Sequence, residues 1–242
     1  MDNYSQHIWH PFTHPNDTRS AEPIHIVSGD GVYITDSHGK RYLDGNAGGL
    51  WCVNAGHNRR EINQAITQQL EQMAFYHIFH GVTHPRACEL AERLIGLTRP
   101  EGMSKVFFTS GGSDGVENAI KLARQYHGLK GESSRKKIIA LKGSYHGTHL
   151  GAAAVSGNLA LQRAYGPVMP GGLHVDMPCL YRNPWGCSDP DELVEQCIQQ
   201  LINEIEFRDR VKYGIHDFNS IYHSVLNIDR IKVCEWLKMV LD

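Results

Sequence analysis

The sequence contains no run of apolar residues that approaches the length of about 20 residues that a membrane-spanning helix needs. Its first residues include neither a basic stretch nor an apolar one, so no secretory signal is predicted. Lysine and arginine number 24 against 26 for aspartate and glutamate, and the formal net charge is -2. Because proteins that bind nucleic acids carry a basic excess, we expect no nucleic-acid partner and no membrane partner. A cytoplasmic location is predicted.

A CxxC pair is also missing, and the six cysteines are scattered along the chain. In a chain of 242 residues this distribution is typical of free thiols in a reducing compartment and not of a disulfide framework. The cysteines are Cys52, Cys88, Cys179, Cys187, Cys197 and Cys234.

Histidine is abundant, with 15 residues, but the HExxH pattern of zinc hydrolases is absent. Gly81 and Pro85 interrupt any helix that would bring the second of two histidine clusters onto one face. We therefore predict no metal site. The clusters are His7, His10 and His14, and His77, His80 and His84.

The amino-terminal part of the chain predicts an irregular arm and a small antiparallel meander over residues 24–44, with turns at Ser28–Gly31 and Asp36–Lys40. Apolar residues at helical spacing then predict a helix capped by Asn58 that runs to about Met73. A second helix is expected over Pro85–Leu97.

From residue 106 onward strands alternate with helices, which predicts an α/β fold with a parallel sheet covered on both faces. A long surface excursion is expected at 157–190. The predicted strands are Val106–Thr109 and Ile138–Leu141, and the predicted helices are Ser113–His127 and Asp191–Arg208.

A strand, a glycine turn and the start of a helix meet in the segment Phe107–Lys121. The first amides of a helix have no partner within the helix and lie at the positive end of its dipole, so they can bind an anion such as phosphate. Gly111 and Gly112 carry no Cβ that would keep a phosphate away. A plain Gly-Ser turn with Ser113 as helix cap is the alternative.

A second candidate segment, Gly143–Gly147, follows the strand Ile138–Leu141. Ligands of open α/β sheets bind at the carboxyl ends of strands, and the flat ring of Tyr145 could stack there on a planar heterocycle. A surface turn that happens to carry a tyrosine is the alternative.

Taken together and in this order, these segments resemble the class III aminotransferases, especially the branch that acts on ω-amino acids or amines with pyruvate as acceptor. The likeness extends from about His7 to Asp209. Its markers are His10–Thr13, Gly29–Tyr33, Tyr42–Gly45, Gly49–His57, Phe107–Arg124 and Tyr145–Gly147.

The resemblance implies a fold-type-I transferase that depends on pyridoxal 5'-phosphate (PLP) and usually forms a homodimer. By position it implies that the backbone amides of Gly112 and Ser113, with the Ser113 hydroxyl, bind the cofactor phosphate, and that Gly111 belongs to the same cofactor site. Tyr145 would stack on the pyridine ring, with His146 and Gly147 beside it. Trp51 and Phe12 would line the substrate pocket. Gly111 stands where the family commonly has serine.

The residues after Asp209 match neither the family's aspartate that pairs with the pyridine nitrogen nor its Schiff-base lysine. Lys212, Lys232 and Lys238 lie in no recognisable context, so we assign no catalytic residue and expect weak PLP binding or none.

We therefore expect a truncated and inactive aminotransferase. A non-catalytic partner subunit of an intact aminotransferase is the alternative. The expected domains are an arm and meander belonging to the minor domain at 1–57, the first part of the PLP-binding major domain at 58–209, and a divergent tail at 210–242.

Overall fold

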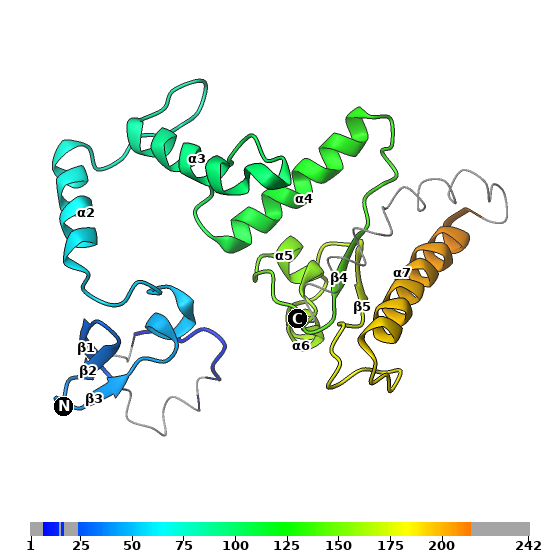
Figure 1. Ribbon diagram of the computed structural model, residues 1–242, viewed down its shortest axis with the longest axis horizontal. Helices are drawn as coiled ribbons and strands as arrows, with labels where there is room; N and C mark the ends of the chain where they lie inside the picture. Colours follow the sequence, from blue (N-terminus) through cyan, green and yellow to red (C-terminus); the bar gives the residue numbers. More distant parts are fainter. Residues whose placement is uncertain (1–6, 15, 17–23, 214–242) are drawn as a thin grey trace. The chain divides into compact units, whose positions relative to one another are not determined.

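The computed structural model describes residues 7–14, 16 and 24–213 (Figure 1). The chain divides into two compact units, Met1–Lys105 and Val106–Asp242. No helix within the described ranges is long and apolar enough to cross a membrane. The predicted domain boundaries after residues 57 and 209 stay predictions.

An antiparallel meander opens the first unit, as the turn pattern predicted. Its strands are β1 (Ile26–Asp30), β2 (Tyr33–Asp36) and β3 (Arg41–Leu43). Asp36, the one buried residue among those described in this unit, accepts hydrogen bonds from the backbone N–H groups of His38 and Lys40, both at 2.9 Å. The Tyr42 hydroxyl donates a third bond at 2.8 Å. The carboxylate therefore fixes the turn between β2 and β3.

A strained loop, η1 (Ala47–Trp51), follows the meander. Ala47 and Trp51 have φ values of 48° and 58°, in the left-handed region that side chains rarely adopt. The Asp44 carboxylate accepts hydrogen bonds from the N–H groups of Asn46 at 3.2 Å and Gly48 at 2.6 Å, and it pairs with Nε2 of His57 at 2.7 Å. These bonds offset the cost of the backbone strain.

Two helices complete the first unit: α2 (Arg60–Gln72) and α3 (Pro85–Thr98), the latter ending in the short η2 (Arg99–Glu101). The prediction that Asn58 caps α2 is wrong. A capping residue needs an extended backbone, whereas Asn58 has a φ of 54° and accepts a hydrogen bond from the Asn63 side chain. The helix begins after Arg59, whose backbone is extended.

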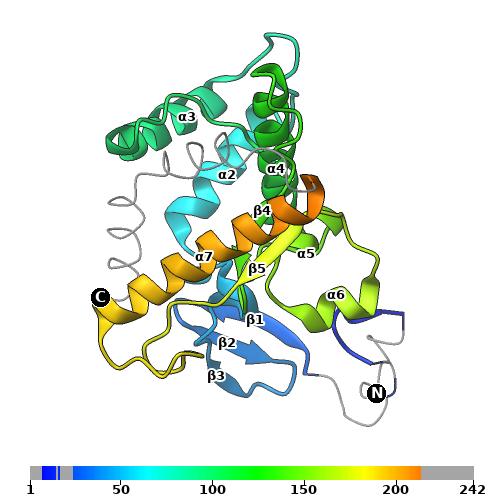
Figure 2. The same ribbon diagram turned by 90° about the vertical axis from the view of Figure 1, so that its right-hand side faces the viewer.

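The second unit contains the predicted parallel sheet, formed by β4 (Ile138–Leu141) and β5 (Gly172–Val175). Two helices, α5 (Leu150–Val155) and α7 (Pro190–Tyr213), pack on opposite faces of the strands (Figures 1 and 2). The helix α4 (Gly112–Leu129) packs against α5. The short helix α6 (Leu159–Tyr165) follows α5 in the chain. The predicted α/β fold is confirmed.

Three elements of this unit differ from the predictions. Val106–Thr109 is not a strand, because no described segment pairs with it, while β4 and β5 pair with each other. The predicted excursion at 157–190 instead contains α6 and β5. Lastly, α7 continues to Tyr213, beyond the predicted end at Arg208.

Glycines allow α5 to approach the sheet unusually closely. A Cβ on Gly172 of β5 would overlap the carbonyl oxygen of Ala154 and lie 2.9 Å from its carbonyl carbon. A Cβ on Gly157 would lie 2.5 Å from the backbone nitrogen of Gly143. The α5 residues Gly151 to Val155 are all buried, so small side chains and missing side chains together create this contact.

Gly172→Ala should lower the free energy of unfolding by about 1–3 kcal/mol or more, because the new methyl group overlaps the backbone of α5. Gly128→Ala in α4 is the matched control, since its added Cβ would meet no atom of the described residues within 4 Å beyond the adjoining residues and the backbone of α4. The control should be neutral or stabilising by up to about 1 kcal/mol. Urea denaturation followed by circular dichroism measures both changes. Equal losses would contradict this account of the packing.

Acidification should release the loop that carries Trp51. The hydrogen bond with His57, followed by that from Gly48, lowers the pKa of Asp44, so its stabilisation is present above the unfolded-state pKa of about 3.9 and is lost as pH falls through the lower folded-state pKa. The emission of Trp51, obtained by subtracting that of Trp51→Phe, should change in this range. Asp44→Asn should show the released emission already at neutral pH, while the exposed Asp30→Asn should behave like the unaltered chain. An unchanged emission in Asp44→Asn would refute the role of the carboxylate.

Candidate functional site

The first turn of α4 offers open space for an anion. The helix begins at Gly112, preceded by Gly111 with an extended backbone (φ -172°, ψ 170°). Apart from the adjoining residues and the backbone of α4 itself, no atom of the described residues lies within 4 Å of the position that a Cβ on either glycine would occupy. Because the first amides of a helix lack partners inside it and lie at the positive end of the dipole, they are available to a negatively charged group.

The structure brings the two glycine-bearing segments together at Ser113 and Gly147. The Ser113 hydroxyl accepts a hydrogen bond from the backbone N–H of Thr148 at 3.1 Å, which leaves its own proton free to be donated. Gly147 has a φ of 121°, and a Cβ there would lie 2.9 Å from the Cα of Ser113. Glycine is therefore required at 147 by both its conformation and its neighbour.

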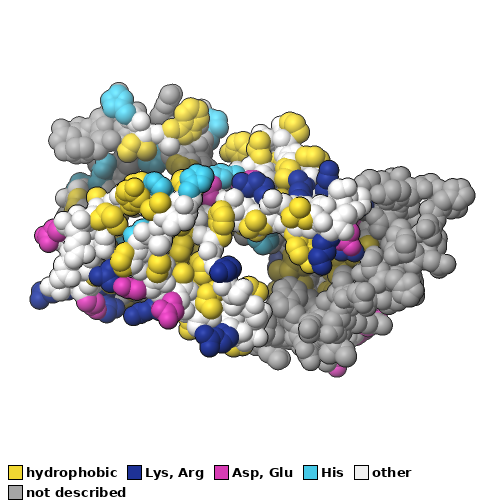
Figure 3. All heavy atoms as spheres, turned by 90° about the horizontal axis from the view of Figure 1, so that it is seen from above, with side chains coloured by type: hydrophobic (Ala, Val, Ile, Leu, Met, Phe, Trp, Pro, Cys, Tyr) yellow, Lys and Arg dark blue, Asp and Glu magenta, His cyan; other side chains and the backbone are white. Residues whose placement is uncertain are grey.

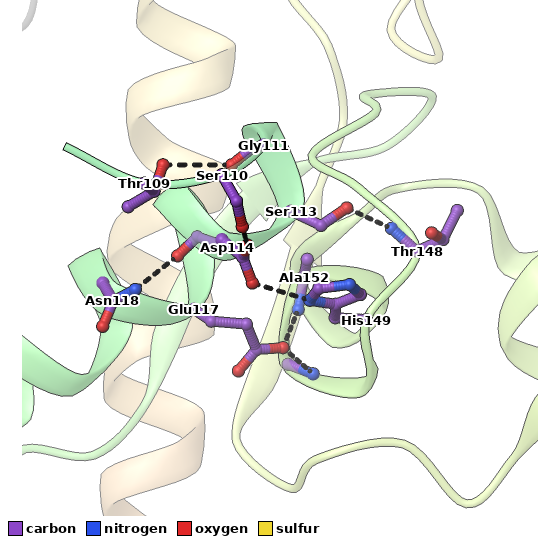
Figure 4. A network of polar contacts seen from close by, with 11 residues as sticks. Thr109, Ser110, Gly111, Ser113, Asp114, Glu117, Asn118, Thr148, His149 and Ala152 are labelled. Carbon is purple, nitrogen blue, oxygen red and sulfur yellow. Dashed lines mark hydrogen bonds and ion pairs between the residues drawn. The ribbon is translucent and has the colours of Figure 1, made fainter. Parts of the chain in front are cut away.

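Further polar contacts join the start of α4 to the segment before and within α5 (Figure 4). Oε1 of Glu117 accepts hydrogen bonds from the N–H groups of Gly151 at 2.7 Å and Ala152 at 3.1 Å. Asp114 is bonded by the hydroxyl of Ser110 and lies 3.5 Å from Nδ1 of His149. Glu117 lies within the motif Phe107–Arg124, but the sequence pattern alone gives it no role.

The loop after β4 holds Tyr145 and His146 at the surface. The Ser144 hydroxyl donates to the carbonyl oxygen of Leu141 at 2.7 Å, and the N–H of Gly143 donates to the carbonyl oxygen of Gly157 at 3.1 Å. These contacts close the turn behind Tyr145. The Tyr145 side chain is 64% exposed, which leaves its ring available to a ligand.

An ion pair joins the carboxyl ends of the two strands, where Lys142 follows β4 and Asp176 follows β5. Their side chains meet at 2.8 and 2.9 Å, and Gln200 of α7 donates to Asp176 at 2.5 Å. Burial raises the pKa of Asp176, but the bonds from Lys142 and Gln200 outweigh burial and hold that pKa below its usual value. The pair fixes the edge of the sheet from which the Tyr145 loop departs.

Phe12 and Trp51, predicted to line the substrate pocket, belong to the unit Met1–Lys105. Both side chains are largely exposed and both residues have positive φ values, 56° for Phe12 and 58° for Trp51. Such strained conformations concentrate at binding sites, but the assignment of these two residues stays a prediction.

Two of the clustered histidines have structural contacts. Nδ1 of His84 accepts a hydrogen bond from the N–H of Ala87 at 3.4 Å and so caps α3. The ring of His77 stacks on Tyr76 and Phe79. Within the described ranges, no three histidine, cysteine, aspartate or glutamate side chains are placed to hold a metal ion. The described cysteines are free thiols, and Cys234 lies outside the described residues.

Curated aminotransferases match most of this chain. It is 37% identical over 196 residues to the adenosylmethionine-8-amino-7-oxononanoate aminotransferase of Geobacter sulfurreducens, a match that covers 81% of this chain and 43% of that protein. It is 35% identical over 195 residues to the putrescine–pyruvate aminotransferase of Pseudomonas aeruginosa, covering 81% and 42%. The chain thus spans less than half the length of these relatives.

Solved structures agree with this result. An amine transaminase from an uncultivated Pseudomonas species, solved in its PLP-bound form, is similar with a TM-score of 0.79 and 45% identity over 84% of this chain and 45% of that one. The (S)-enantioselective omega-transaminase of Thermomicrobium roseum gives a TM-score of 0.79 and 42% identity over 84% and 44%. The family model for class III aminotransferases matches residues 15–211. The chain therefore belongs to the class III aminotransferase family.

Proposed function

We propose that this chain carries the phosphate and ring sites of a PLP-dependent aminotransferase that transfers an amino group from an amine or ω-amino acid to a keto acid such as pyruvate. The observation that carries the proposal is the contact of Ser113 with Gly147 and Thr148. This contact joins the anion-binding turn to the loop of Tyr145 within one compact unit. A phosphorylated aromatic ring needs these two features side by side.

The described residues fit PLP. The space beside Gly111 and Gly112 is open, and Ser113 retains a proton to donate to a phosphate oxygen. Tyr145 presents an exposed ring that can stack on a pyridine ring, with His146 and Gly147 completing that side of the site. When bound, PLP supplies an electron sink for the bond changes at the amino-bearing carbon of the substrate.

The residues of this chain bind and orient the cofactor in this proposal. The amides of the first turn of α4 and the Ser113 hydroxyl hold the phosphate, while Tyr145 sets the plane of the ring. Trp51 and Phe12 are proposed to contact the amine substrate. Two further tasks, the covalent attachment of the cofactor and the proton transfers, need other residues. The proposal assigns them to groups outside the family motifs that this sequence contains.

Apolar exposure favours a second candidate, a non-catalytic partner subunit of an intact aminotransferase. The amphipathic α2 exposes Ile62, Ile66 and Leu70, and hydrophobic side chains are visible at the surface in Figure 3. Such surfaces mark protein interaction sites. Isolation of the tagged chain from its own host together with a full-length class III aminotransferase would support this candidate, and recovery of the chain alone would count against it.

Incubated with PLP, an amine donor and pyruvate, the 242-residue chain should produce alanine no faster than PLP alone. The physical reason is that the covalent role of a cofactor-binding lysine cannot be taken over by its neighbours. An intact relative of the family, assayed in parallel, is the positive control. Alanine formation that depends on the chain and survives removal of host transaminases would refute this expectation.

Ser113→Ala should weaken PLP binding. A hydrogen bond to a charged group contributes about 1.5–3 kcal/mol, which corresponds to a loss of affinity of roughly ten- to hundredfold. Equilibrium dialysis measures the affinity, and competition by inorganic phosphate reports on the same site. The exposed Ser134→Ala is the matched control and should bind normally. If both variants bind PLP equally well, Ser113 does not hold the phosphate.

A further inference from the structure

Ser156 is a fully buried hydroxyl at the end of α5, with an exposed fraction of 0%. Its oxygen accepts a hydrogen bond from the backbone N–H of His146 at 2.9 Å. The carbonyl oxygens of Ala152 and Gly147 lie 2.9 and 3.2 Å away and share its single proton. A serine that only closes its own helix needs just the Ala152 contact. The other two contacts, with His146 and Gly147, reach a separate loop that lies 10 and 9 residues earlier in the chain.

Those two contacts hold the loop at two backbone groups, the N–H of His146 and the carbonyl oxygen of Gly147. The N–H of His146 belongs to the peptide group that joins it to Tyr145, so holding this N–H fixes the orientation of the backbone beside Tyr145. The carbonyl oxygen of Gly147 is held by the same hydroxyl. The loop is thereby fixed in direction as well as in position.

The ring of Tyr145 depends on this backbone for its orientation. It is 64% exposed, and among the described residues no aromatic ring stacks on it. For an exposed side chain of this kind, the backbone sets the direction of the Cα–Cβ bond and the rotamers that are allowed. On the other side of Gly147, the N–H of Thr148 is bonded to Ser113. Two serine hydroxyls, Ser156 and Ser113, therefore hold the loop between them.

We infer that Ser156 is a positioning residue for ring binding: it acts through the backbone of His146 and Gly147 to direct Tyr145 toward the ring of a cofactor whose phosphate lies at Ser113. This inference rests on the proposed function and deepens it. It separates two tasks within one site, because Ser113 contacts the phosphate itself, whereas Ser156 has no contact with any ligand and affects only the ring.

The separation gives distinct expectations for two ligands. Ser156→Ala should weaken PLP binding by about tenfold, because the N–H of His146 and the buried carbonyl of Gly147 lose their partner and the loop backbone is no longer fixed. Binding of inorganic phosphate, measured by its competition with PLP, should change by less than about twofold, because the Ser113 hydroxyl and the first amides of α4 stay in place in this variant. Ser113→Ala should weaken the binding of both ligands.

A double-mutant cycle tests whether Ser156 acts through Tyr145. In a chain that already carries Tyr145→Ala, the additional Ser156→Ala change should have little further effect on the affinity for PLP. Ser156→Thr keeps the hydroxyl and should restore much of the affinity. Ala153→Gly lowers the stability of α5 without touching the loop bonds, so it serves as the control for general destabilisation.

The outcomes separate this inference from the proposed function. If the unaltered chain shows no saturable PLP binding that inorganic phosphate displaces, both are overturned. If the unaltered chain binds PLP but Ser156→Ala binds it equally well, this inference alone fails. It also fails if Ala153→Gly reproduces the loss, or if Ser156→Ala costs the same affinity with and without Tyr145. A loss that is specific to PLP and absent without Tyr145 supports it.

Discussion

Close backbone contact between α5 and the two parallel strands is the constraint on which the candidate site depends. It requires glycine at 157 and 172, and the small residues Ala152–Ala154 within α5. Because α5 lies so near the sheet, its last turn brings Ser156 to the loop after β4. Its first turn likewise meets Glu117 of α4. One short helix therefore contacts both α4, which begins at the candidate phosphate-binding turn, and the Tyr145 loop.

Much of this fold could be predicted because its signals are local. Apolar spacing defines α3 and α4, and a short apolar run marks β4, all within a few residues of the predicted bounds. The strand prediction for Val106–Thr109 fails because apolar residues alone do not form a strand without a pairing partner. The missed β5 lies in a segment rich in glycine and proline, where Gly172 is present for close packing and not for a turn.

The candidate site likewise contains residues that a local sequence pattern marks and residues whose role depends on contacts formed only in the folded chain. Ser113 and Tyr145 could be singled out because each lies in a recognisable glycine-bearing segment. The sequence assigns no role to Ser156 or Glu117, because it does not show which backbone groups their side chains meet. The N–H group of Ala152 that Glu117 binds lies 35 residues away in the chain. A serine after a run of alanines resembles a helix end, and only the folded chain shows which loop its hydroxyl meets.

The contact between Ser113 and Gly147 also limits how this sequence can change. Any side chain at 147 would collide with the residue at 113, and the backbone at 147 already favours glycine. A larger residue at 113 would press on the same loop. The two positions are therefore coupled: a replacement at either one is tolerated only if the backbone or side chain at the other moves to make room. Substitutions should therefore be rare at positions 113 and 147 and more frequent on the exposed face of α4.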